Sequence, residues 1–328
     1  MLDLIIIGAG PIGLEAAIRA KRAGLRYRVL EKGALVDAIY RYPTYMTFFT
    51  TSERLEIGGH PLVTATDKPT RKEALDYYRK VAHAEALEIE AYTKVTALRR
   101  DADGFEVTAA HRDGEPRTLR SRFVALATGY FDHPNRLGVP GEDLPHVSHY
   151  YDEAHPYYGQ EVTIVGAGSS AADAALDLFR AGARVTMVHR GDDFRHSLKY
   201  WIRPNLENRV KEGSIVAHFR TEIEEIRDDA VIATKDGRRL TIPAERVFLL
   251  TGYHAAGDLL DQVGAVTDEV TLAAELDEQF QTTVPGLYCI GSAGFGRRTS
   301  DVFIENGLVH AEVAITDVAQ RAGTPADA

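Results

Sequence analysis

The chain has 328 residues, of which 45% are hydrophobic and 26% charged, a composition typical of a globular protein with about two domains. Its formal net charge of −10 and the lack of a Lys/Arg-rich stretch argue against nonspecific nucleic-acid binding. No apolar run approaches the roughly 20 residues of a membrane-spanning helix, so we expect no membrane association and a cytoplasmic location. Cys289 is the only cysteine, which excludes an intrachain disulfide, and no metal site is expected.

The opening stretch, residues 4–17 (LIIIGAGPIGLEAA), begins with a short β-branched run that predicts a strand buried on both faces. Gly8, Gly10 and Gly13 follow with the spacing G-x-G-x-x-G, which suits a tight turn, close approach of the backbone to a pyrophosphate, and close helix packing. The helix that starts there directs free N–H groups at phosphates. The next strand ends in Glu31, where a carboxylate that binds a ribose 2′-OH is expected.

A mixed segment follows. Residues 40–52, YRYPTYMTFFTTS, combine aromatic rings and hydroxyls without a helical or strand period. Such a loop could wall off a flat ring system or bury its aromatic side chains against the domain. The apolar spacing of residues 71–88 predicts an amphipathic helix. Strands are predicted at residues 91–98, 105–109 and 119–126, with a hairpin turn at 101–104.

The glycine motif recurs in the second half of the chain. Residues 161–172, EVTIVGAGSSAA, place Gly166, Gly168 and Ala171 at the three glycine positions. A helix over about 170–181 is predicted to follow, and then a strand. The chain therefore contains two predicted dinucleotide folds.

The two copies differ after the second strand. His189 occupies the place that corresponds to Glu31, and Arg190 follows it. A carboxylate would repel a 2′-phosphate, whereas an arginine offers it a bidentate, charge-assisted partner. The second site is therefore predicted to bind NADPH, and the first to bind FAD. The alternative is that Arg190 is a solvated charge at the end of a strand.

Two similar phrases suggest how the domains are connected. Ala-Thr-Gly-Tyr at 127–130 and Leu-Thr-Gly-Tyr at 250–253 each end an apolar strand, and prolines and glycines cluster at 134–145. These phrases indicate that the second domain is inserted into the first. The predicted division is an FAD-binding domain at 1–130 and 253–328 with an NADPH-binding domain at 131–252.

The last segment completes the first domain. Residues 284–291 predict a buried strand, and a final amphipathic helix runs to about Val318. Its N-cap candidates are Thr299, Ser300 and Asp301. The N-terminus of this helix could stabilise negative charge on a reduced flavin, or the helix could lie on the surface without a ligand. Residues 323–328 have no reason to be ordered.

The order of these motifs resembles the low-molecular-weight thioredoxin reductases over nearly the whole length. Longer phrases resemble the bacillithiol disulfide reductase (YpdA) family: DAIYRYP at 37–43, TFF at 47–49, LEIG at 55–58, VPGED at 139–143 and FIENG at 303–307. The resemblance implies an α/β fold with two Rossmann-like, three-layer ββα dinucleotide-binding domains. It also implies an FAD-containing, NADPH-dependent homodimer, with Arg190 and Arg195 on the 2′-phosphate.

The residues expected to bind the two cofactors come from these motifs and from the resemblance. They are Gly8, Gly10, Pro11, Ile12, Gly13, Glu31, Lys32, Tyr42, Thr47, Phe49, Thr128, Gly129, Gly166, Gly168, Ser169, Ser170, Ala171, His189, Arg190, Arg195, Gly291, Ser292 and Val302.

Three departures from these families concern the chemistry. The Cys-x-x-Cys pair of thioredoxin reductases is replaced by SHYYDEAHPYYG at 148–159, and the cysteine that the YpdA family has in its first glycine turn is replaced by Ile12. Ser292 stands where many relatives have an aspartate. It can still hydrogen-bond a flavin phosphate or ribityl group, more weakly than a carboxylate.

The catalytic group is therefore expected to be the flavin itself, which takes hydride from NADPH. Cys289, His149 and His155 are the remaining side-chain candidates, although a cysteine in an apolar strand is usually inert and such histidines are often structural. The predicted function is reduction of a low-molecular-weight disulfide such as bacillithiol disulfide. The alternatives are a ferredoxin or flavodoxin reductase, a flavin monooxygenase, and a non-enzymatic nucleotide sensor.

Overall fold

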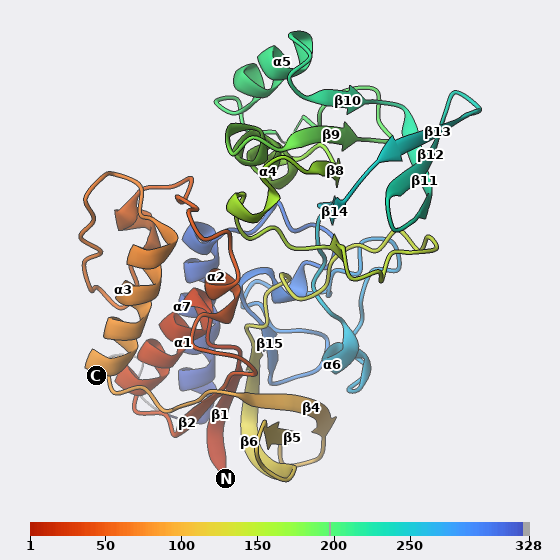
Figure 1. Ribbon diagram of the computed structural model, residues 1–328. Coiled ribbons are helices and arrows are strands. Elements are labelled where there is room, and N and C mark those ends of the chain that lie inside the picture. Colours follow the sequence, from red (N-terminus) through yellow and green to blue (C-terminus); the bar gives the residue numbers. More distant parts are fainter. Residues whose placement is uncertain (197, 324–328) are drawn as a thin grey trace. The chain divides into compact units, whose positions relative to one another are not determined.

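The computed structural model describes residues 1–196 and 198–323 (Figure 1). The chain forms two compact units, residues 1–133 with 253–328 (unit 1) and residues 134–252 (unit 2). The sequence-based division placed the first crossing after Tyr130, and in the structure the chain leaves unit 1 after His133. The tail expected to be unordered lies, beyond Gly323, outside the described residues.

The described residues of unit 1 form a seven-stranded sheet that divides at β6. The N-terminal half of β6 pairs with antiparallel β5, whereas its C-terminal half pairs with parallel β15, so that one edge of the sheet divides into a hairpin and a single strand. The order is β3-β2-β1-β6-β5-β4, with β1 (Leu2–Ile7), β2 (Tyr27–Leu30), β3 (Ile89–Glu90), β4 (Thr93–Arg100), β5 (Phe105–His111), β6 (Arg117–Leu126) and β15 (Leu287–Cys289).

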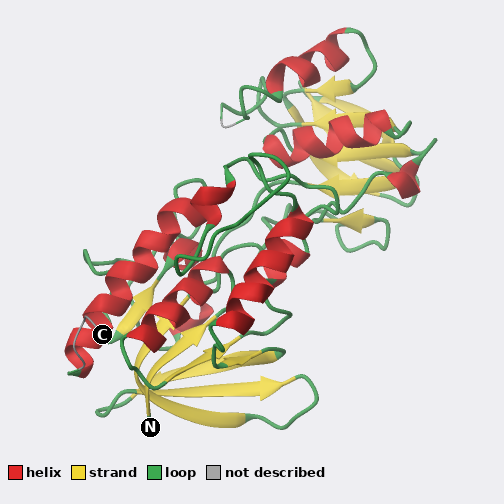
Figure 2. Ribbon diagram, turned by 90° about the vertical axis from the view of Figure 1, so that its left-hand side faces the viewer, coloured by secondary structure: helices red, strands yellow, loops and turns green. Residues whose placement is uncertain are grey.

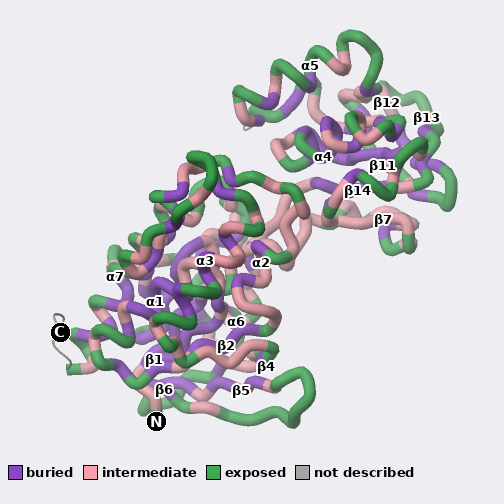
Figure 3. Tube along the Cα trace, turned by 60° about the vertical axis from the view of Figure 1, so that its left-hand side comes forward, coloured by how far each residue is buried: buried purple, intermediate pink, exposed green. Residues whose placement is uncertain are grey.

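Both faces of β1 are buried, as its β-branched run predicts. Leu4 and Ile6 pack into the core beneath the helices, whereas Ile5 and Ile7 pack with residues of the β4–β5 hairpin and β15. The buried stretches of the central strands are visible in Figure 3. This burial leaves the carboxyl end of β1 as the place where the first glycine turn meets solvent.

The long helices of unit 1 gather on one side of its sheet (Figure 2). Among them, α1 packs on α7. Thr70 and Glu73 form a reciprocal capping box at the start of α3. The helical segments are α1 (Pro11–Arg22), α2 (Asp37–Tyr40), η1 (Ser52–Leu55), α3 (Arg71–Ala84), α6 (Asp258–Asp261), η3 (Gly291–Gly294) and α7 (Ile304–Ala322). Among the described residues, none of the helices has the length and hydropathy needed to cross a membrane.

The start of α7 differs from the prediction. Its N-cap is Phe303 rather than Thr299, Ser300 or Asp301. Asn306 takes over the capping task, because its side-chain oxygen accepts the N–H of Phe303 at 2.7 Å and its amide donates to the carbonyl of Asp301 at 2.8 Å. A side chain inside the first turn thus fixes the start of the helix, and the N-cap prediction was wrong.

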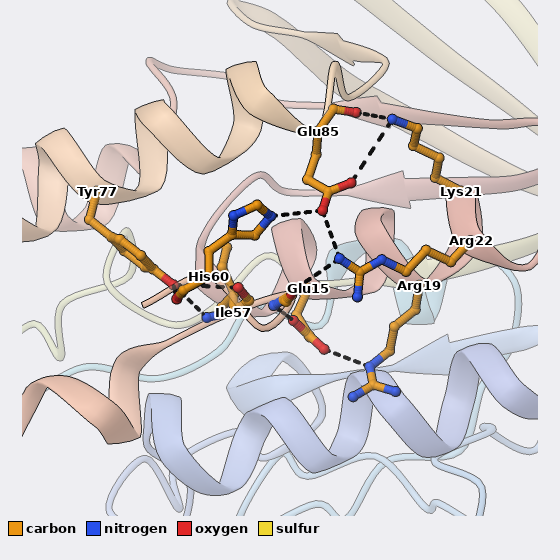
Figure 4. Close-up of polar contacts among 9 residues, drawn as sticks. Glu15, Arg19, Lys21, Arg22, Ile57, His60, Tyr77 and Glu85 are labelled. Atoms are coloured by element: carbon orange, nitrogen blue, oxygen red, sulfur yellow. Dashed lines mark hydrogen bonds and ion pairs between the residues drawn. The ribbon is translucent and has the colours of Figure 1, made fainter. Parts of the chain in front are cut away.

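A polar network fastens the loop after η1 to α1 and to the end of α3 (Figure 4). Buried Glu15 accepts the N–H of Gly58 at 2.7 Å and pairs with Arg19 at 2.6 Å. Glu85 contacts His60 at 2.8 Å and Arg22 at 2.7 Å. The pKa of the Glu85 carboxyl is held below its ordinary value, chiefly by the hydrogen bond to His60. The network ties the helix behind the first glycine turn to two distant segments.

Unit 2 repeats the parallel arrangement in a smaller form. Its described residues form a five-stranded parallel sheet, β10-β9-β8-β14-β7, and a three-stranded antiparallel sheet, β11-β12-β13. Ile164 packs on the side of α4, whereas Val165 packs against the small sheet. The elements are β7 (Val147–Ser148), η2 (His155–Tyr157), β8 (Glu161–Val165), α4 (Ser169–Arg180), β9 (Arg184–Val188), α5 (Arg203–Lys211), β10 (Val216–His218), β11 (Thr221–Ile226), β12 (Ala230–Lys235), β13 (Arg238–Pro243) and β14 (Arg246–Leu249).

Candidate nucleotide-binding sites

The first glycine turn is packed against backbone at Gly8 and Gly13 and open at Gly10. Gly8 has φ +110°, and a Cβ there would collide with the carbonyl oxygen of Ala127, so β6 packs directly under the turn. A Cβ on Gly13 would collide with the carbonyl oxygen of Gly8. A Cβ on Gly10, in contrast, would meet no heavy atom of the described residues within 4 Å. The N-terminus of α1, which starts at Pro11 and has no side-chain cap, therefore faces open space suited to a pyrophosphate.

Glu31 is buried at the rim of this turn. One of its carboxylate oxygens accepts the N–H of Ala9 at 2.7 Å, and the other accepts the N–H of Gly33 at 2.8 Å. Burial raises the pKa of the Glu31 carboxyl above its ordinary value, although the two N–H groups act in the opposite direction. Each oxygen keeps a further lone pair, which fits the expected acceptor of ribose hydroxyls.

Lys32, expected at the cofactor, lies in an ion-pair group. Its ammonium contacts Asp132 at 2.5 Å, and Arg41 pairs with both Asp132 and Asp37. Burial opposes ionisation of Asp132, but Lys32 and Arg41 outweigh it and hold the pKa of this carboxyl below its ordinary value. Sequence reasoning missed Asp132, although an acid two residues after the first Thr-Gly-Tyr phrase was visible in the sequence. A cofactor contact by Lys32 stays a prediction.

Aromatic rings from three distant segments meet in unit 1. The ring centroid of Tyr42 lies 5.1 Å from that of Phe131, edge-on, and Phe131 lies 5.0 Å from Tyr253. Tyr130 also packs near Tyr253, at 6.2 Å, so the tyrosines of the two repeated phrases lie together. The sequence left open whether the loop of residues 40–52 walls off a flat ring system or buries its aromatic side chains against the domain. Tyr42 of that loop joins this cluster, and Phe48, 6.3 Å from it, is buried in the core.

The other predicted residues of the loop lie elsewhere in unit 1. Thr47 is exposed and pairs with Thr70, just before α3, in an isolated β-bridge. Phe49 is 38% exposed. Their expected contacts with the cofactor stay predictions.

Segments that follow three neighbouring strands meet near the first turn. Thr128 and Gly129 follow β6, and Gly291 and Ser292 follow β15, while β6 lies between β1 and β15. Because carboxyl ends of adjacent parallel strands share one edge of a sheet, these residues lie where a nucleotide is expected. Val302, also expected there, is buried just before α7.

Ile12 packs between two glycines of the C-terminal segment. Its Cγ1 lies 3.1 Å from the place of a Cβ on Gly291, and its Cδ1 lies 2.9 Å from the place of one on Gly307. Both glycines thus leave room for the branched side chain. This position, where the family resemblance implied a cysteine, is filled here by an apolar group that belongs to the packing of unit 1.

The second turn has the same backbone with small differences. Gly166 has φ +140°, and a Cβ on it would collide with the carbonyl oxygen of Leu250. Ala171 takes the third glycine position. Its Cβ lies 3.4 Å from the place that a Cβ on Gly166 would occupy. Near Gly168 the nearest atom to a Cβ would be Cδ of Arg195, at 3.9 Å. The turn therefore leaves open space at Gly168, next to Ser169 and Ser170 at the start of α4. We call this space the second cradle.

Basic side chains border this second cradle. Arg190 and Arg195 are exposed, and neither forms an ion pair with any described residue. Burial and then these two arginines lower the pKa of the neighbouring His189. The nearby acid Asp193 pairs with Arg203 at 3.2 Å. Two uncompensated guanidinium groups beside a phosphate-binding turn fit a phosphorylated ribose.

The surroundings of the three side-chain candidates for catalysis do not favour a catalytic role. Cys289 is completely buried, and burial raises the pKa of its thiol to about 12, so the reactive thiolate is disfavoured. His149 lies 3.4 Å from Glu142, a buried carboxylate that accepts the N–H groups of Leu137 and Gly138. Burial lowers the pKa of His149. His155 is exposed on η2.

Comparison with known proteins agrees with this geometry. Residues 5–291 match the family described as pyridine nucleotide-disulphide oxidoreductase. The chain belongs to this family.

Within the family, the chain is 39% identical to bacilliredoxin reductase Bdr from Bacillus subtilis over 97% of each chain. The structure of bacillithiol disulfide reductase Bdr (YpdA) from Bacillus cereus matches with a TM-score of 0.95 and 39% identity, covering 98% of this chain and 99% of that one. A ferredoxin–NADP reductase from Ignicoccus hospitalis is 25% identical over 89% of this chain and 90% of its own. The predicted YpdA resemblance is confirmed.

Membership in this family confirms the broad function and the fold. The protein is a flavoprotein oxidoreductase of the disulfide reductase type, with a thioredoxin-reductase-like fold, and it uses FAD and NADPH. This result removes the non-enzymatic sensor from the predicted alternatives. The open turn with buried Glu31 and the open turn with Arg190 and Arg195 fit the two cofactors.

Proposed function

We propose that this protein reduces a low-molecular-weight disulfide, bacillithiol disulfide or its mixed disulfide with a protein, at the expense of NADPH. The observation that carries the proposal is the 39% identity over 97% of the chain to bacilliredoxin reductase Bdr. When bound, NADPH supplies a hydride and FAD relays the two electrons to the acceptor. The chain acts as a homodimer in the cytoplasm.

We assign the two turns separate tasks. The N–H groups at the start of α1 hold the pyrophosphate of FAD, and Glu31 holds its ribose, because the carboxyl is already fixed by Ala9 and Gly33. Arg190 and Arg195 hold the 2′-phosphate of NADPH. The acidic rim thereby disfavours the 2′-phosphate of NADPH at the first turn, and the basic rim favours it at the second.

No thiol of this chain takes part in the reduction. Cys289 is the only cysteine, and it has no exposed surface. Cys289→Ala is expected to keep kcat for the disulfide within about twofold and to lower the stability of the protein by about 1 kcal/mol through the small cavity. Steady-state kinetics and chemical unfolding measure both effects. A loss of disulfide reduction with flavin reduction intact would contradict the thiol-free route.

Reoxidation of the flavin identifies the acceptor. The protein is reduced anaerobically with one equivalent of NADPH, and bacillithiol disulfide is then added while the flavin absorbance is followed. We expect rapid return of the yellow colour together with two thiols per flavin. Return of the colour only with oxygen, through a long-lived oxygenated flavin, would favour a monooxygenase.

A second candidate is electron transfer to ferredoxin or flavodoxin. It is favoured by the likeness to a ferredoxin–NADP reductase at 25% identity and by the buried state of the lone thiol. In the same experiment, reoxidation by ferredoxin or flavodoxin but not by disulfide would establish it in place of the first proposal.

A further inference from the structure

Arg195 and Lys199 are both held along the second glycine turn by their backbone N–H groups. The N–H of Arg195 donates to the carbonyl of Ala167 at 3.1 Å, and the N–H of Lys199 donates to Oγ of Ser169 at 3.3 Å. Ala167 lies inside the turn, and Ser169 is the first residue of α4. Lys199 is therefore fastened at the helix end that points its N–H groups at a pyrophosphate.

An aromatic pair lies directly beside this lysine. Nζ of Lys199 lies 5.9 Å from the ring centroid of Trp201, and Tyr200 packs edge-on against Trp201 at 4.9 Å. Trp201 is 43% exposed and Tyr200 is 81% exposed. Two large rings exposed next to a cationic turn form a surface that a bound nucleotide can cover.

The charges around the turn also favour an anion. The first turn of α4 contains no acidic residue. Of the two acids that follow Arg190, Asp193 is held by Arg203, while Asp192 is exposed near His189. A phosphate that approaches the turn therefore meets a positive rim.

We infer that Lys199 is a third cationic contact of the nicotinamide nucleotide, that it acts on the pyrophosphate, and that Trp201 lies against the bound nucleotide. The inference rests on the proposed NADPH site. Lys199 is tied to the start of α4, where the pyrophosphate is expected, whereas Arg190 follows β9, where the ribose is expected. Lys199 thus serves NADP and NAD alike, and Arg190 serves only NADP.

Binding of the oxidised nucleotides tests this inference without turnover. Calorimetry of the FAD-loaded protein with NADP⁺ and NAD⁺ should show that Lys199→Met weakens both by about tenfold, the loss of one charge-assisted contact, and that Lys199→Arg restores most of the affinity. Lys211→Met, a lysine at the end of α5, is the matched control and should leave both dissociation constants unchanged. Trp201 is the only tryptophan, so its emission should change on titration with the same dissociation constant.

The possible outcomes separate the inference from the proposed function. Unchanged binding by Lys199→Met, or tryptophan emission that does not respond to nucleotide, would overturn the inference while the NADPH site stands. A loss confined to NADP⁺ would move Lys199 to the 2′-phosphate and so overturn the pyrophosphate assignment. A parent protein that binds neither nucleotide would instead overturn the proposed NADPH site.

Discussion

The first and second glycine turns differ most at the residues that end the strand behind each of them. Behind the first, Glu31 is buried and held by two backbone N–H groups. Behind the second, Arg190 and Arg195 are both exposed, and neither forms an ion pair with any described residue. The difference fits a tightly held cofactor at a preformed, buried acceptor and an exchanging cosubstrate at exposed surface charges.

The largest effects are expected where a side chain would enter the first turn. Gly13→Ala places a Cβ against the carbonyl oxygen of Gly8, so α1 must move away from the turn. We expect colourless protein that unfolds more easily by about 2 to 4 kcal/mol, in the range of other overpacked or strained sites. Flavin content and urea unfolding measure the two effects.

Gly10→Ala is the matched variant, because its Cβ would project into open space. It should fold like the parent and bind FAD more weakly. If Gly10→Ala and Gly13→Ala lost the same amount of folding stability, the distinction between a packed and an open side of the turn would be wrong.

A smaller effect is expected at the second turn. Arg190→Ala should raise KM for NADPH about 10- to 100-fold and leave KM for NADH nearly unchanged. This change corresponds to the roughly 1.5 to 3 kcal/mol that hydrogen bonds to a charged group contribute. Arg209→Ala, on α5 in the same unit, is the control. Equal changes for the two nucleotides would show that Arg190 does not read the 2′-phosphate.

The smallest effect is expected in the polar network that joins α1, the helix after the first turn, to the end of α3 (Figure 4). Glu85→Gln should lower the free energy of unfolding by less than about 1 kcal/mol at pH 7, since the partners are partly exposed. The folded-state pKa of Glu85 lies below its ordinary value of 4.5, so its contribution is present above that pH and is lost as the pH falls through the folded-state pKa. The difference between variant and parent should therefore shrink on acidification.

Urea unfolding at neutral and acidic pH tests this prediction, with Glu88→Gln as the control. Glu88 has an exposed side chain and one ion pair of 3.5 Å with Arg28. A difference between Glu85→Gln and the parent that grew on acidification would contradict the sign derived from the lowered pKa.

Local signals were enough to predict much of this molecule. The glycine spacings and the alternating apolar runs predicted both βαβ units, because turn geometry and strand burial depend on neighbours in sequence. The division of the sheet at β6 was not predicted, since two distant segments share the pairing edge of one strand. The start of α7 was missed because Asn306 caps the helix from inside its first turn.

Some contacts near the predicted site were missed for the same physical reason. The ion pairs of Asp132 with Lys32 and Arg41 join segments far apart in the chain, and composition gives no hint of them. Likewise, the absence of a cysteine at Ile12 was visible in the sequence, but its packing between Gly291 and Gly307 required the fold. Local backbone geometry was therefore predictable from the sequence, whereas these long-range contacts were not.

The central claim is that an acidic rim and a basic rim assign two different nucleotides to the two turns. Stopped-flow reduction of the purified, FAD-loaded protein under anaerobic conditions tests it most directly, with NADPH and NADH compared at equal subsaturating concentrations. The account predicts bleaching of the flavin by NADPH at least about tenfold faster than by NADH, given the energy of the arginine contacts. Equal rates, or faster bleaching by NADH, would contradict it.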